Sequence, residues 1–372
     1  SGKKAQCCGC AGCEKICPKQ AIHMDKDAEG FKYPIIDHTK CIRCGLCEKV
    51  CPFTRPNGIN THTTYDQKIY AFKHHDSLMR KYSSSGGAFS ALADIVLDRG
   101  GVICGCAFDR DYRAKHVCIQ SRDALDDLRK SKYVQSDLKN VFLDIKMYLQ
   151  KEKWVLFTGT SCQAAALQKY LDNSKTDRKY LFICDLVCHG VPSPQIWQEY
   201  LNEMKKKLEG PIKEVCFRYK DEWGGWTPLQ IFIRSDHKKY RAHSSNNEFY
   251  RLFFDHYILR PSCHECPFTS FDRVSDITIA DFWGIEKAKP EFSDDLGVSL
   301  VMINTSQGER LFRRLDSRHK IEASSKEQCV QPNLQHPAPP NPERQDFWDT
   351  YQKFGIKKAI KKYGQDGLTV KI

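Results

Sequence analysis

After residue 66, short apolar runs alternate along the chain with segments in which apolar residues recur at helical spacing. The short runs predict strands at residues 69–72, 101–108, 154–157 and 180–187. The helical spacing predicts helices at residues 88–97, 138–149, 163–171 and 195–208, the last with Ser193 as N-cap and Pro194 in its first turn. Strand–helix alternation of this kind predicts an α/β domain with a mixed, largely parallel sheet.

The pattern changes in the last third of the chain and before residue 66. Strand-like runs follow residue 215, at 216–219, 229–233 and 277–280. Five prolines between Pro332 and Pro342 mark a break, and the tail from Glu343 has the spacing of an amphipathic helix. Residues 54–66 are polar and contain a Thr/His run, which predicts a linker.

The chain contains nineteen cysteines, and eight of them form two equally spaced sets near its start. The first set reads Cys7-x2-Cys10-x2-Cys13-x3-Cys17-Pro18. The second reads Cys41-x2-Cys44-x2-Cys47-x3-Cys51-Pro52. This spacing, occurring twice, is typical of a bacterial ferredoxin with two [4Fe-4S] clusters, which is a small α+β domain.

The fourth cysteine of each run ligates the other cluster in such ferredoxins. We therefore assign one cluster to Cys7, Cys10, Cys13 and Cys51, and the second to Cys41, Cys44, Cys47 and Cys17. Zinc is the alternative metal, since CxxC pairs also bind zinc, but two complete runs with their prolines favour iron–sulfur. Cys8 is an additional cysteine that we interpret as a non-ligand.

A chain of 372 residues is too long for a ferredoxin alone. We expect a ferredoxin domain at 1–56, a linker at 57–66, a larger domain in two parts at 67–150 and 151–331, and a Pro-rich segment with a C-terminal helix at 332–372. No apolar run reaches the roughly 18 residues that a membrane span needs, and no leader precedes Cys7. Cysteines patterned for metal in such a chain predict a cytoplasmic protein.

The net charge of +12 counts cysteines as neutral. A cluster with four thiolates carries about −2, so three clusters would leave about +6. A basic protein suits an acidic electron-transfer partner such as ferredoxin or flavodoxin. Lysines and arginines are scattered apart from short clusters such as 205–207, so a nucleic-acid partner is not expected.

A third set of cysteines lies in the larger domain. Cys162 falls between a predicted strand and a helix, Cys188 directly follows the next strand, and Cys263-x2-Cys266 lies in a later loop. Positions where strands end are the side on which open α/β sheets bind ligands, so these four cysteines predict a third cluster. Zinc at Cys263 and Cys266 and the use of Cys184 instead of Cys188 are the alternatives. The other cysteines are interpreted as core or incidental: Cys104, Cys106, Cys118, Cys216 and Cys329.

A Ser/Gly-rich turn at residues 83–87 precedes the predicted helix at 88–97. Such a turn presents backbone N–H groups and a positive dipole end to an anion, and we expect its glycines to permit close approach by a phosphate. A polar, basic segment at residues 130–136 could meet the same anion, as a nucleotide-bearing flavin would require. The alternative is that the turn only caps a helix.

Five motifs together resemble a known family. They are Ser84-Ser85-Gly86-Gly87, residues 159–163 (GTSCQ), residues 185–192 (DLVCHGVP), residues 263–267 (CHECP) and residues 275–284 (SDITIADFWG). In this order they resemble the beta subunit of coenzyme F420-reducing hydrogenase and F420 dehydrogenases. The resemblance spans about residues 66–310, and fusion to an N-terminal ferredoxin also occurs in this family. Ser161 stands where many relatives have proline.

The resemblance implies an FAD-binding α/β domain with its own [4Fe-4S] cluster. It implies cluster ligands at Cys162, Cys188, Cys263 and Cys266. It implies flavin contacts at Ser84, Ser85, Gly86, Gly87, Lys132, Tyr133, Gln135, Ser136, Gly159 and Thr160. The family also includes ferredoxin-dependent reductases of other substrates, such as 7-hydroxymethyl chlorophyll a reductase, so it does not fix the substrate.

The resulting hypothesis is an oxidoreductase in which three [4Fe-4S] clusters connect a ferredoxin-like partner to FAD, with hydride exchange to a small organic acceptor, coenzyme F420 or another metabolite. His189 or Asp281 would donate a proton to the substrate; the alternative for each is a hydrogen-bonded loop residue. Two other functions stay open: a non-catalytic electron-transfer subunit of a larger redox complex, and a zinc-structured nucleic-acid-binding protein. A homo-oligomer is also compatible with the sequence.

Overall fold

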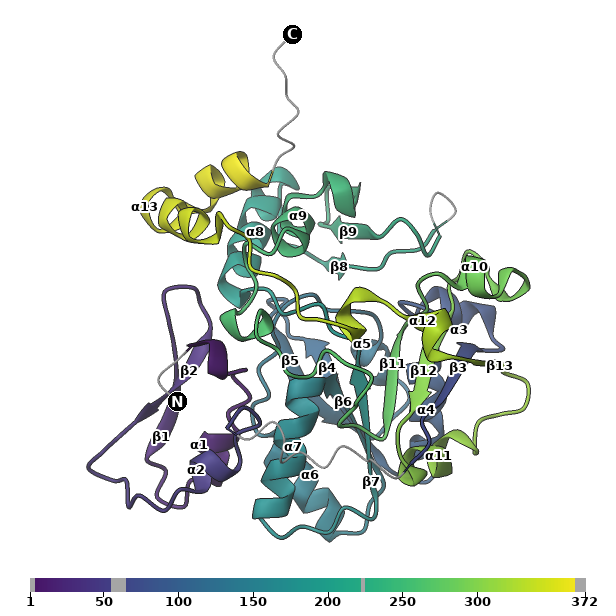
Figure 1. Ribbon diagram of the computed structural model, residues 1–372. Helices are drawn as coiled ribbons and strands as arrows, with labels where there is room; N and C mark the ends of the chain where they lie inside the picture. Colours follow the sequence, from purple (N-terminus) through teal and green to yellow (C-terminus); the bar gives the residue numbers. More distant parts are fainter. Residues whose placement is uncertain (1–3, 55–64, 222–224, 365–372) are drawn as a thin grey trace.

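The computed structural model describes residues 4–54, 65–221 and 225–364. Within these ranges the chain forms an N-terminal module, a central eight-stranded sheet covered by helices, and a lobe of helices with a small second sheet (Figure 1). Most of the proposed linker at 57–66 lies outside the described residues. No helix in the described ranges has the length and apolar character needed to cross a membrane.

The N-terminal module contains one antiparallel hairpin, β1 (Ile22–Lys26) and β2 (Lys32–Ile36), and two short helices, α1 (Gly12–Ile16) and α2 (Leu46–Lys49). Both helices begin after a residue in the left-handed region, Ala11 with φ 59° and Gly45 with φ 73°. The two cysteine runs thus have equivalent backbone geometry at the start of each helix, which turns the chain sharply around the thiols.

The central sheet has the strand order β13-β3-β12-β11-β7-β6-β4-β5. Its four middle strands, β11, β7, β6 and β4, are parallel, and the outer strands pair antiparallel. The strands are β3 (Lys68–Lys73), β4 (Val102–Phe108), β5 (Ala114–Ile119), β6 (Val155–Thr160), β7 (Leu181–Leu186), β11 (Ile277–Asp281), β12 (Ser299–Ile303) and β13 (Lys320–Ser324). The expected mixed α/β sheet with a parallel centre is therefore present.

Alternating side chains of the middle strands fill two separate cores. Val155 and Phe157 of β6 pack towards α6 (Val141–Gln150) and α7 (Ser161–Asn173), whereas Leu156 packs on the opposite face. That opposite face is covered by α4 (Ala88–Leu97), α5 (Leu125–Leu128) and α11 (Ser306–Phe312). Successive side chains of a strand point to opposite faces of the sheet, and both faces are covered by helices here. These short runs are therefore apolar at every position.

The helical lobe packs α8 (Pro194–Lys207), α9 (Glu248–Phe254) and α13 (Arg344–Tyr363) around buried aromatic side chains. Ser193 caps α8, because its Oγ accepts the Ile196 N–H at 3.3 Å. A small antiparallel sheet adjoins the lobe, with strands β8 (Glu214–Cys216), β9 (Gln230–Arg234) and β10 (Lys239–His243). The remaining short helices are α3 (Ser77–Lys81), α10 (Ile285–Ala288) and α12 (Lys326–Cys329).

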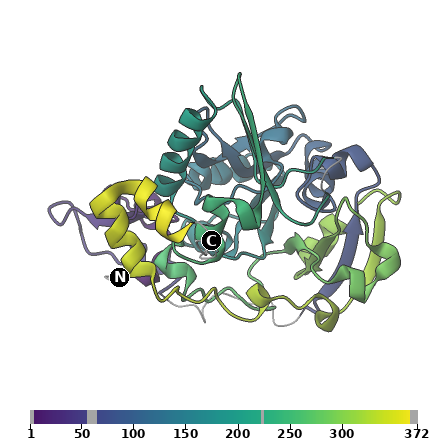
Figure 2. The ribbon, with the colours of Figure 1, turned by 90° about the horizontal axis from the view of Figure 1, so that it is seen from above.

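Contacts that hold the N-terminal module against the rest of the molecule include those beside α7 and beside α13 (Figures 1 and 2). Near α7, the Phe53 ring packs edge-on against Phe268, with ring centroids 6.0 Å apart. At the hairpin tip, Glu29 forms an ion pair with Arg344 of α13, and its carbonyl accepts the Ser193 hydroxyl at 2.6 Å. The module therefore has a defined orientation towards the larger domain.

One pair of cysteines has a bond that the sequence did not predict. Cys104 and Cys118, expected to be core or incidental residues, form a disulfide between β4 and β5, and Cys104 is buried in the core. The register of the antiparallel pair places them directly opposite each other, so the 14-residue separation in sequence hides a cross-strand neighbour.

Candidate functional site

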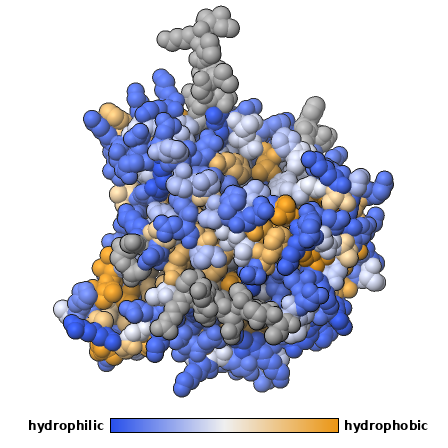
Figure 3. Space-filling view, in the orientation of Figure 1, coloured by the Kyte–Doolittle hydropathy of each residue, from blue (hydrophilic) through white to orange (hydrophobic). Residues whose placement is uncertain are grey.

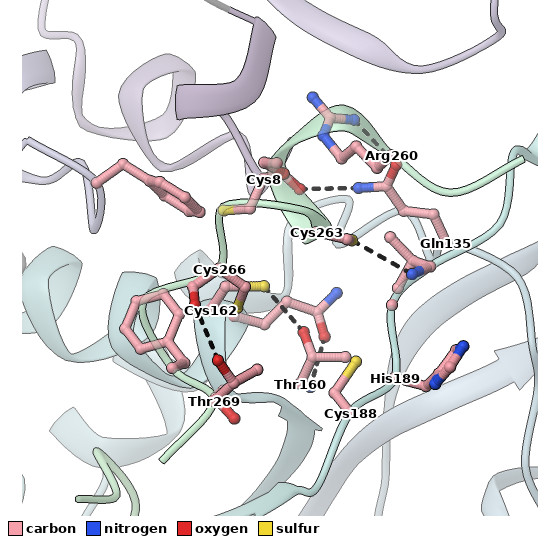
Figure 4. Close-up of a pocket in the computed structure, with 17 residues that line it drawn as sticks. Cys8, Gln135, Thr160, Cys162, Cys188, His189, Arg260, Cys263, Cys266 and Thr269 are labelled. Atoms are coloured by element: carbon pink, nitrogen blue, oxygen red, sulfur yellow. Dashed lines mark hydrogen bonds between the residues drawn. The ribbon is translucent and has the colours of Figure 1, made fainter. Parts of the chain in front are cut away.

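Five cysteines line one buried cavity below the N-terminal module (Figure 4). Cys162 lies in the first turn of α7, and Cys188 follows β7. Cys263 ends the short 3-10 helix Pro261–Cys263, and Cys266 follows three residues later. The fifth is Cys8, which the N-terminal module contributes. The folded chain thus brings the four cysteines of the third predicted set to one place, from three loops far apart in the sequence.

The surroundings of these four thiols fit a metal cluster. Each accepts a hydrogen bond from a backbone N–H, donated to Cys162, Cys188, Cys263 and Cys266 by Gln163, Gly190, Val191 and Phe268 respectively. Burial raises the pKa of Cys188 and of Cys266 to about 12, and the pKa of Cys263 well above its usual value. Buried thiols with such pKa values become thiolates only when a metal neutralises them, and N–H···S bonds are usual around cluster ligands.

Cys8 differs from these four cysteines in its contacts. Its thiol hydrogen-bonds with two others, Cys10 of the N-terminal module and Cys162 of the larger domain. These hydrogen bonds, together with burial, raise the pKa of Cys8 well above its usual value. Cys8 thus lies between two sets of assigned ligands, and its role as a non-ligand stays a prediction.

A buried arginine that the sequence analysis missed ties together the loops of the third set. Arg273 pairs with Asp185 at 2.6 Å, and both side chains are almost completely buried. The same guanidinium donates to Ser161 Oγ, next to Cys162, to the Leu186 carbonyl, two residues before Cys188, and to the Phe268 carbonyl, two residues after Cys266. Arg273 therefore fixes the relative positions of three ligand-bearing segments.

A second, larger cavity of about 290 Å³ adjoins the thiol cavity. It opens where β6, β7 and β11 end, which is where open α/β sheets bind ligands. The two cavities share a wall made of Thr160, Gln163, Cys188, His189, Gly190 and Val191. The larger cavity is lined by eight of the ten residues predicted to contact flavin: Ser84, Ser85, Gly87, Lys132, Tyr133, Ser136, Gly159 and Thr160.

The other two predicted flavin residues lie elsewhere. Gln135 lines the thiol cavity, where its amide nitrogen donates to the Cys8 carbonyl at 2.8 Å. A Cβ on Gly86 would collide with the Phe72 carbonyl oxygen of β3. The close packing of the turn against the sheet therefore requires a glycine at this position, and its expected contact with a flavin phosphate stays a prediction.

The Ser/Gly turn and the basic segment at 130–136 are in contact with each other, which is compatible with the prediction that both meet one anion. Ser84 Oγ accepts the Ser131 N–H at 2.8 Å, which joins the two segments at the mouth of the larger cavity. Lys132 donates instead to carbonyls of its own loop, those of Asp127 at 2.7 Å and Arg129 at 2.6 Å. Burial lowers the pKa of Lys132 to about 8. Cys106 and His116 also line this cavity and were not predicted.

The two predicted proton donors have different surroundings. His189 lines both cavities; its Nε2 lies 3.0 Å from His256 Nε2, and burial lowers its pKa to about 4, so the imidazole is neutral. Asp281 lines the larger cavity as a carboxylate held by three donors. Arg218 donates to it from Nη1 at 2.6 Å and Nη2 at 3.1 Å, and Trp226 donates from Nε1 at 2.8 Å.

Comparison with known proteins assigns the larger domain. Models of the N- and C-terminal parts of the coenzyme F420 hydrogenase/dehydrogenase beta subunit match residues 69–142 and 152–328. The chain belongs to this beta-subunit family. The N-terminal match contains the Ser/Gly turn and the basic segment, and the C-terminal match contains the third cysteine set and the Arg273–Asp185 pair. The family resemblance inferred from the five motifs is thus confirmed.

Residues 6–54 match a 4Fe-4S dicluster domain, so this member of the beta-subunit family carries an iron–sulfur module at its N-terminus. A solved structure of the F420-reducing [NiFe] hydrogenase complex from Methanosarcina barkeri, derivatised with xenon, resembles the chain at 19% sequence identity. That likeness covers 79% of this chain and 90% of the other, with a TM-score of 0.49. No curated protein matches the chain.

The thiols of the dicluster module also accept backbone hydrogen bonds. Gly9 N–H donates to Cys7 Sγ at 3.4 Å, and Ala21 N–H donates to Cys17 Sγ at 3.3 Å. Burial and then the neighbouring thiols of Cys10 and Cys7 raise the pKa of Cys13. In this beta-subunit family member, Cys44 of the second run is exposed, whereas Cys10 faces the larger domain through Cys8.

Proposed function

We propose that the protein is an iron–sulfur flavoprotein oxidoreductase. Three [4Fe-4S] clusters would relay electrons between a ferredoxin-like partner and FAD, and the flavin would exchange hydride with a small organic acceptor. The observation that carries the proposal is the shared wall between the thiol cavity and the larger cavity, since the four thiols proposed as ligands lie directly beside a cavity of cofactor size. Family membership supports a redox role.

The ligands proposed for the inner cluster are Cys162, Cys188, Cys263 and Cys266. The two clusters of the module are assigned to Cys7, Cys10, Cys13 and Cys51, and to Cys17, Cys41, Cys44 and Cys47. For FAD, the backbone N–H groups at the start of α4 and the joined Ser84–Ser131 segment face the larger cavity and suit a phosphate. A bound flavin supplies the coupling between one-electron and hydride chemistry, which no side chain can provide.

Neutral His189 lies at the wall between the cavities, where we propose that its ring N–H donates to the substrate. Asp281 suits a different role from the predicted proton donor. The carboxylate oxygens of Asp281 already accept three hydrogen bonds, so we propose that Asp281 orients Arg218 and Trp226 at the cavity.

An acidic electron-transfer protein is the proposed partner, and the N-terminal module offers a surface for it. Apolar side chains gather on this module at the lower left of Figure 3. Ile35, Ile36 and Ile42 are 48%, 39% and 58% exposed, and Ile42 lies between Cys41 and the exposed Cys44. Basic Lys40 and Arg43 are also exposed there, which suits an acidic partner.

The proposal is tested on protein purified without oxygen. We expect about twelve irons per chain and one flavin released by acid, because three clusters of four irons are assigned. Iron without flavin would instead support the second candidate, a non-catalytic electron-transfer subunit of a larger complex, which the dicluster module favours. Reduced protein is then screened against acceptors, including coenzyme F420 and nicotinamides, to identify the substrate.

A further inference from the structure

Arg260 is a completely buried cation at the boundary between the N-terminal module and the larger domain. Its backbone belongs to the loop of the third cysteine set, since its carbonyl accepts the Cys263 N–H at 2.8 Å. Its side chain reaches into the module, where Nε donates to the Cys7 carbonyl at 2.6 Å and Nη2 donates to the Lys32 carbonyl at 2.9 Å. One side chain thus spans the interface.

The guanidinium has no carboxylate among its acceptors in the described part of the chain. Those acceptors are the two carbonyls, the Gln135 amide oxygen at 3.0 Å and the Cys7 sulfur at 3.6 Å. The ring of Tyr33 covers its face at 4.3 Å. Burying a cation is costly unless an anion compensates it, so the missing carboxylate indicates another source of negative charge.

The nearest candidates for that charge are thiolates of both cysteine sets. Arg260 bonds directly to the Cys7 sulfur, and it lines the same cavity as Cys162, Cys188, Cys263 and Cys266. The Cys8 thiol contacts Cys10 and Cys162 at the same boundary. The hydrogen bonds of Arg260 reach none of Cys17, Cys41, Cys44 and Cys47, the ligands assigned to the outer cluster of the module.

We infer that Arg260 is the shared counter-charge of two clusters, the one assigned to Cys7, Cys10, Cys13 and Cys51 and the one assigned to Cys162, Cys188, Cys263 and Cys266. The inference rests on the three-cluster part of the proposed function. Each cluster gains one electron on reduction, with no bond made or broken, and becomes more negative by one charge. A buried cation stabilises that reduced form, so Arg260 raises both reduction potentials relative to the outer cluster and directs electrons inward.

The test compares three variants with the wild-type protein, each purified anaerobically and checked for about twelve irons. Arg260→Met removes the charge and keeps an apolar stem, whereas Arg260→Lys keeps the charge. Arg344→Met is the matched control, because it cuts the Arg344–Glu29 ion pair at the same module without touching a cysteine. Reduction potentials of the three clusters are followed by electron paramagnetic resonance during a redox titration.

We expect Arg260→Met to lower the equilibrium constant for reduction of the two adjacent clusters at least tenfold, which lowers each reduction potential by about 59 mV for one electron. The reduction potential of the outer cluster should not change. Arg260→Lys should recover most of this shift, and Arg344→Met should show none. An unchanged potential in Arg260→Met, an equal shift in Arg344→Met, or an equal shift of all three clusters would overturn the inference.

If Arg260→Met loses iron, the reduction potentials are measured in Arg260→Gln instead. That variant also removes the charge, but it keeps an N–H donor for the module. A wild-type count near eight irons would refute the third cluster, and with it the proposed function. A wild-type count near twelve with no shift in the charge-removing variants would refute the Arg260 inference alone. Flavin content does not enter the measurement.

Discussion

Two cysteines in contact, Cys8 and Cys162, illustrate how neighbours decide the role of a residue. Cys162 accepts the Gln163 N–H and lies in the first turn of a helix, which favours a thiolate. Cys8 contacts the thiols of both assigned ligand sets, Cys10 and Cys162. In the sequence, only the position of Cys8 outside the spaced run distinguished it, so its role as a non-ligand stays a prediction.

We therefore expect Cys162→Ser to lose about four irons per chain, because one ligand of the inner cluster is removed. Cys8→Ser should retain the full iron content, since the serine hydroxyl can replace the donating thiol. Cys329→Ser is the control, a buried cysteine that bonds to the Lys326 carbonyl and lines neither cavity. Iron and acid-labile sulfide are measured for all three. If Cys8→Ser loses iron like Cys162→Ser, Cys8 is a ligand.

His116 carries a pH dependence of stability. The side chain is buried, and its two ring nitrogens each lie 3.0 Å from a polar atom, Nε2 from the Thr158 carbonyl oxygen and Nδ1 from Ser136 Oγ. Burial lowers the pKa of His116 from 6.5 to about 4. Between pH 6.5 and about pH 4, this histidine is protonated in the unfolded chain but not in the folded chain. The free energy of unfolding therefore falls as the pH is lowered through this range.

Between pH 7.5 and 5.5 this residue should cost about 1 kcal/mol of stability, or about 2–4 °C in Tm for a domain of this size. We expect His116→Asn to narrow the difference in Tm between these two pH values by that amount. The variant also loses packing, but this loss is the same at both pH values and cancels in the difference. An unchanged difference would show that His116 does not titrate in this range.

Elements with an apolar signal were predictable, and elements without one were not. The helix expected at 88–97 is α4, and the strand expected at 69–72 lies within β3. The sequence analysis missed β13 (Lys320–Ser324), because its side chains are mostly exposed and it is a strand only through pairing with β3. It also missed β5, whose pairing with β4 depends on register rather than on composition.

The loops between elements hold the inner site, and Arg273 couples them. Removing this side chain leaves Asp185 charged and buried without its cation, which typically costs 3–5 kcal/mol. We expect Arg273→Met to lose about four irons although every cysteine is intact, because the loops of Cys162, Cys188 and Cys266 are no longer held together.

The control for this variant is Arg310→Met, which removes an exposed hydrogen bond to the Lys179 carbonyl on the other side of the sheet. Its iron content should equal that of the wild-type protein. Iron analysis combined with Tm separates the local effect from global unfolding, since Arg273→Met should keep the eight irons of the N-terminal module. Full iron retention in Arg273→Met would contradict the coupling.

At the scale of the whole molecule, the order of motifs predicted which segments meet but not what joins them. The structure places Cys162, Cys188, Cys263 and Cys266 at one cavity, as strand ends at one edge of a sheet would. The sequence offered no signal for Arg260, because its bond to Cys7 joins residues 253 positions apart. Contacts between the module and the domain follow from docking, which local patterns do not encode.

The proposed order of the clusters, from an outer one with the exposed Cys44 to an inner one in the larger domain, predicts where a partner binds. Ile42 is the most exposed isoleucine of the N-terminal module and adjoins Cys41 of the outer set. A glutamate there would both remove apolar contact and repel an acidic protein. We expect Ile42→Glu to raise the KM for a reduced acidic ferredoxin about tenfold, equivalent to about 1.4 kcal/mol of binding.

The control is Ile321→Glu, at another exposed isoleucine on β13, the edge strand at the far end of the sheet from the module (Figure 1). Ile321→Glu should leave the KM for ferredoxin unchanged. Reduction by a small viologen needs no docking surface, so its rate should be equal in both variants and the wild-type protein. Increasing salt should raise the wild-type KM, because screening weakens the attraction of Lys40 and Arg43 for an acidic partner. Equal effects of the two substitutions, or a slower viologen reaction in Ile42→Glu, would place the entry point elsewhere.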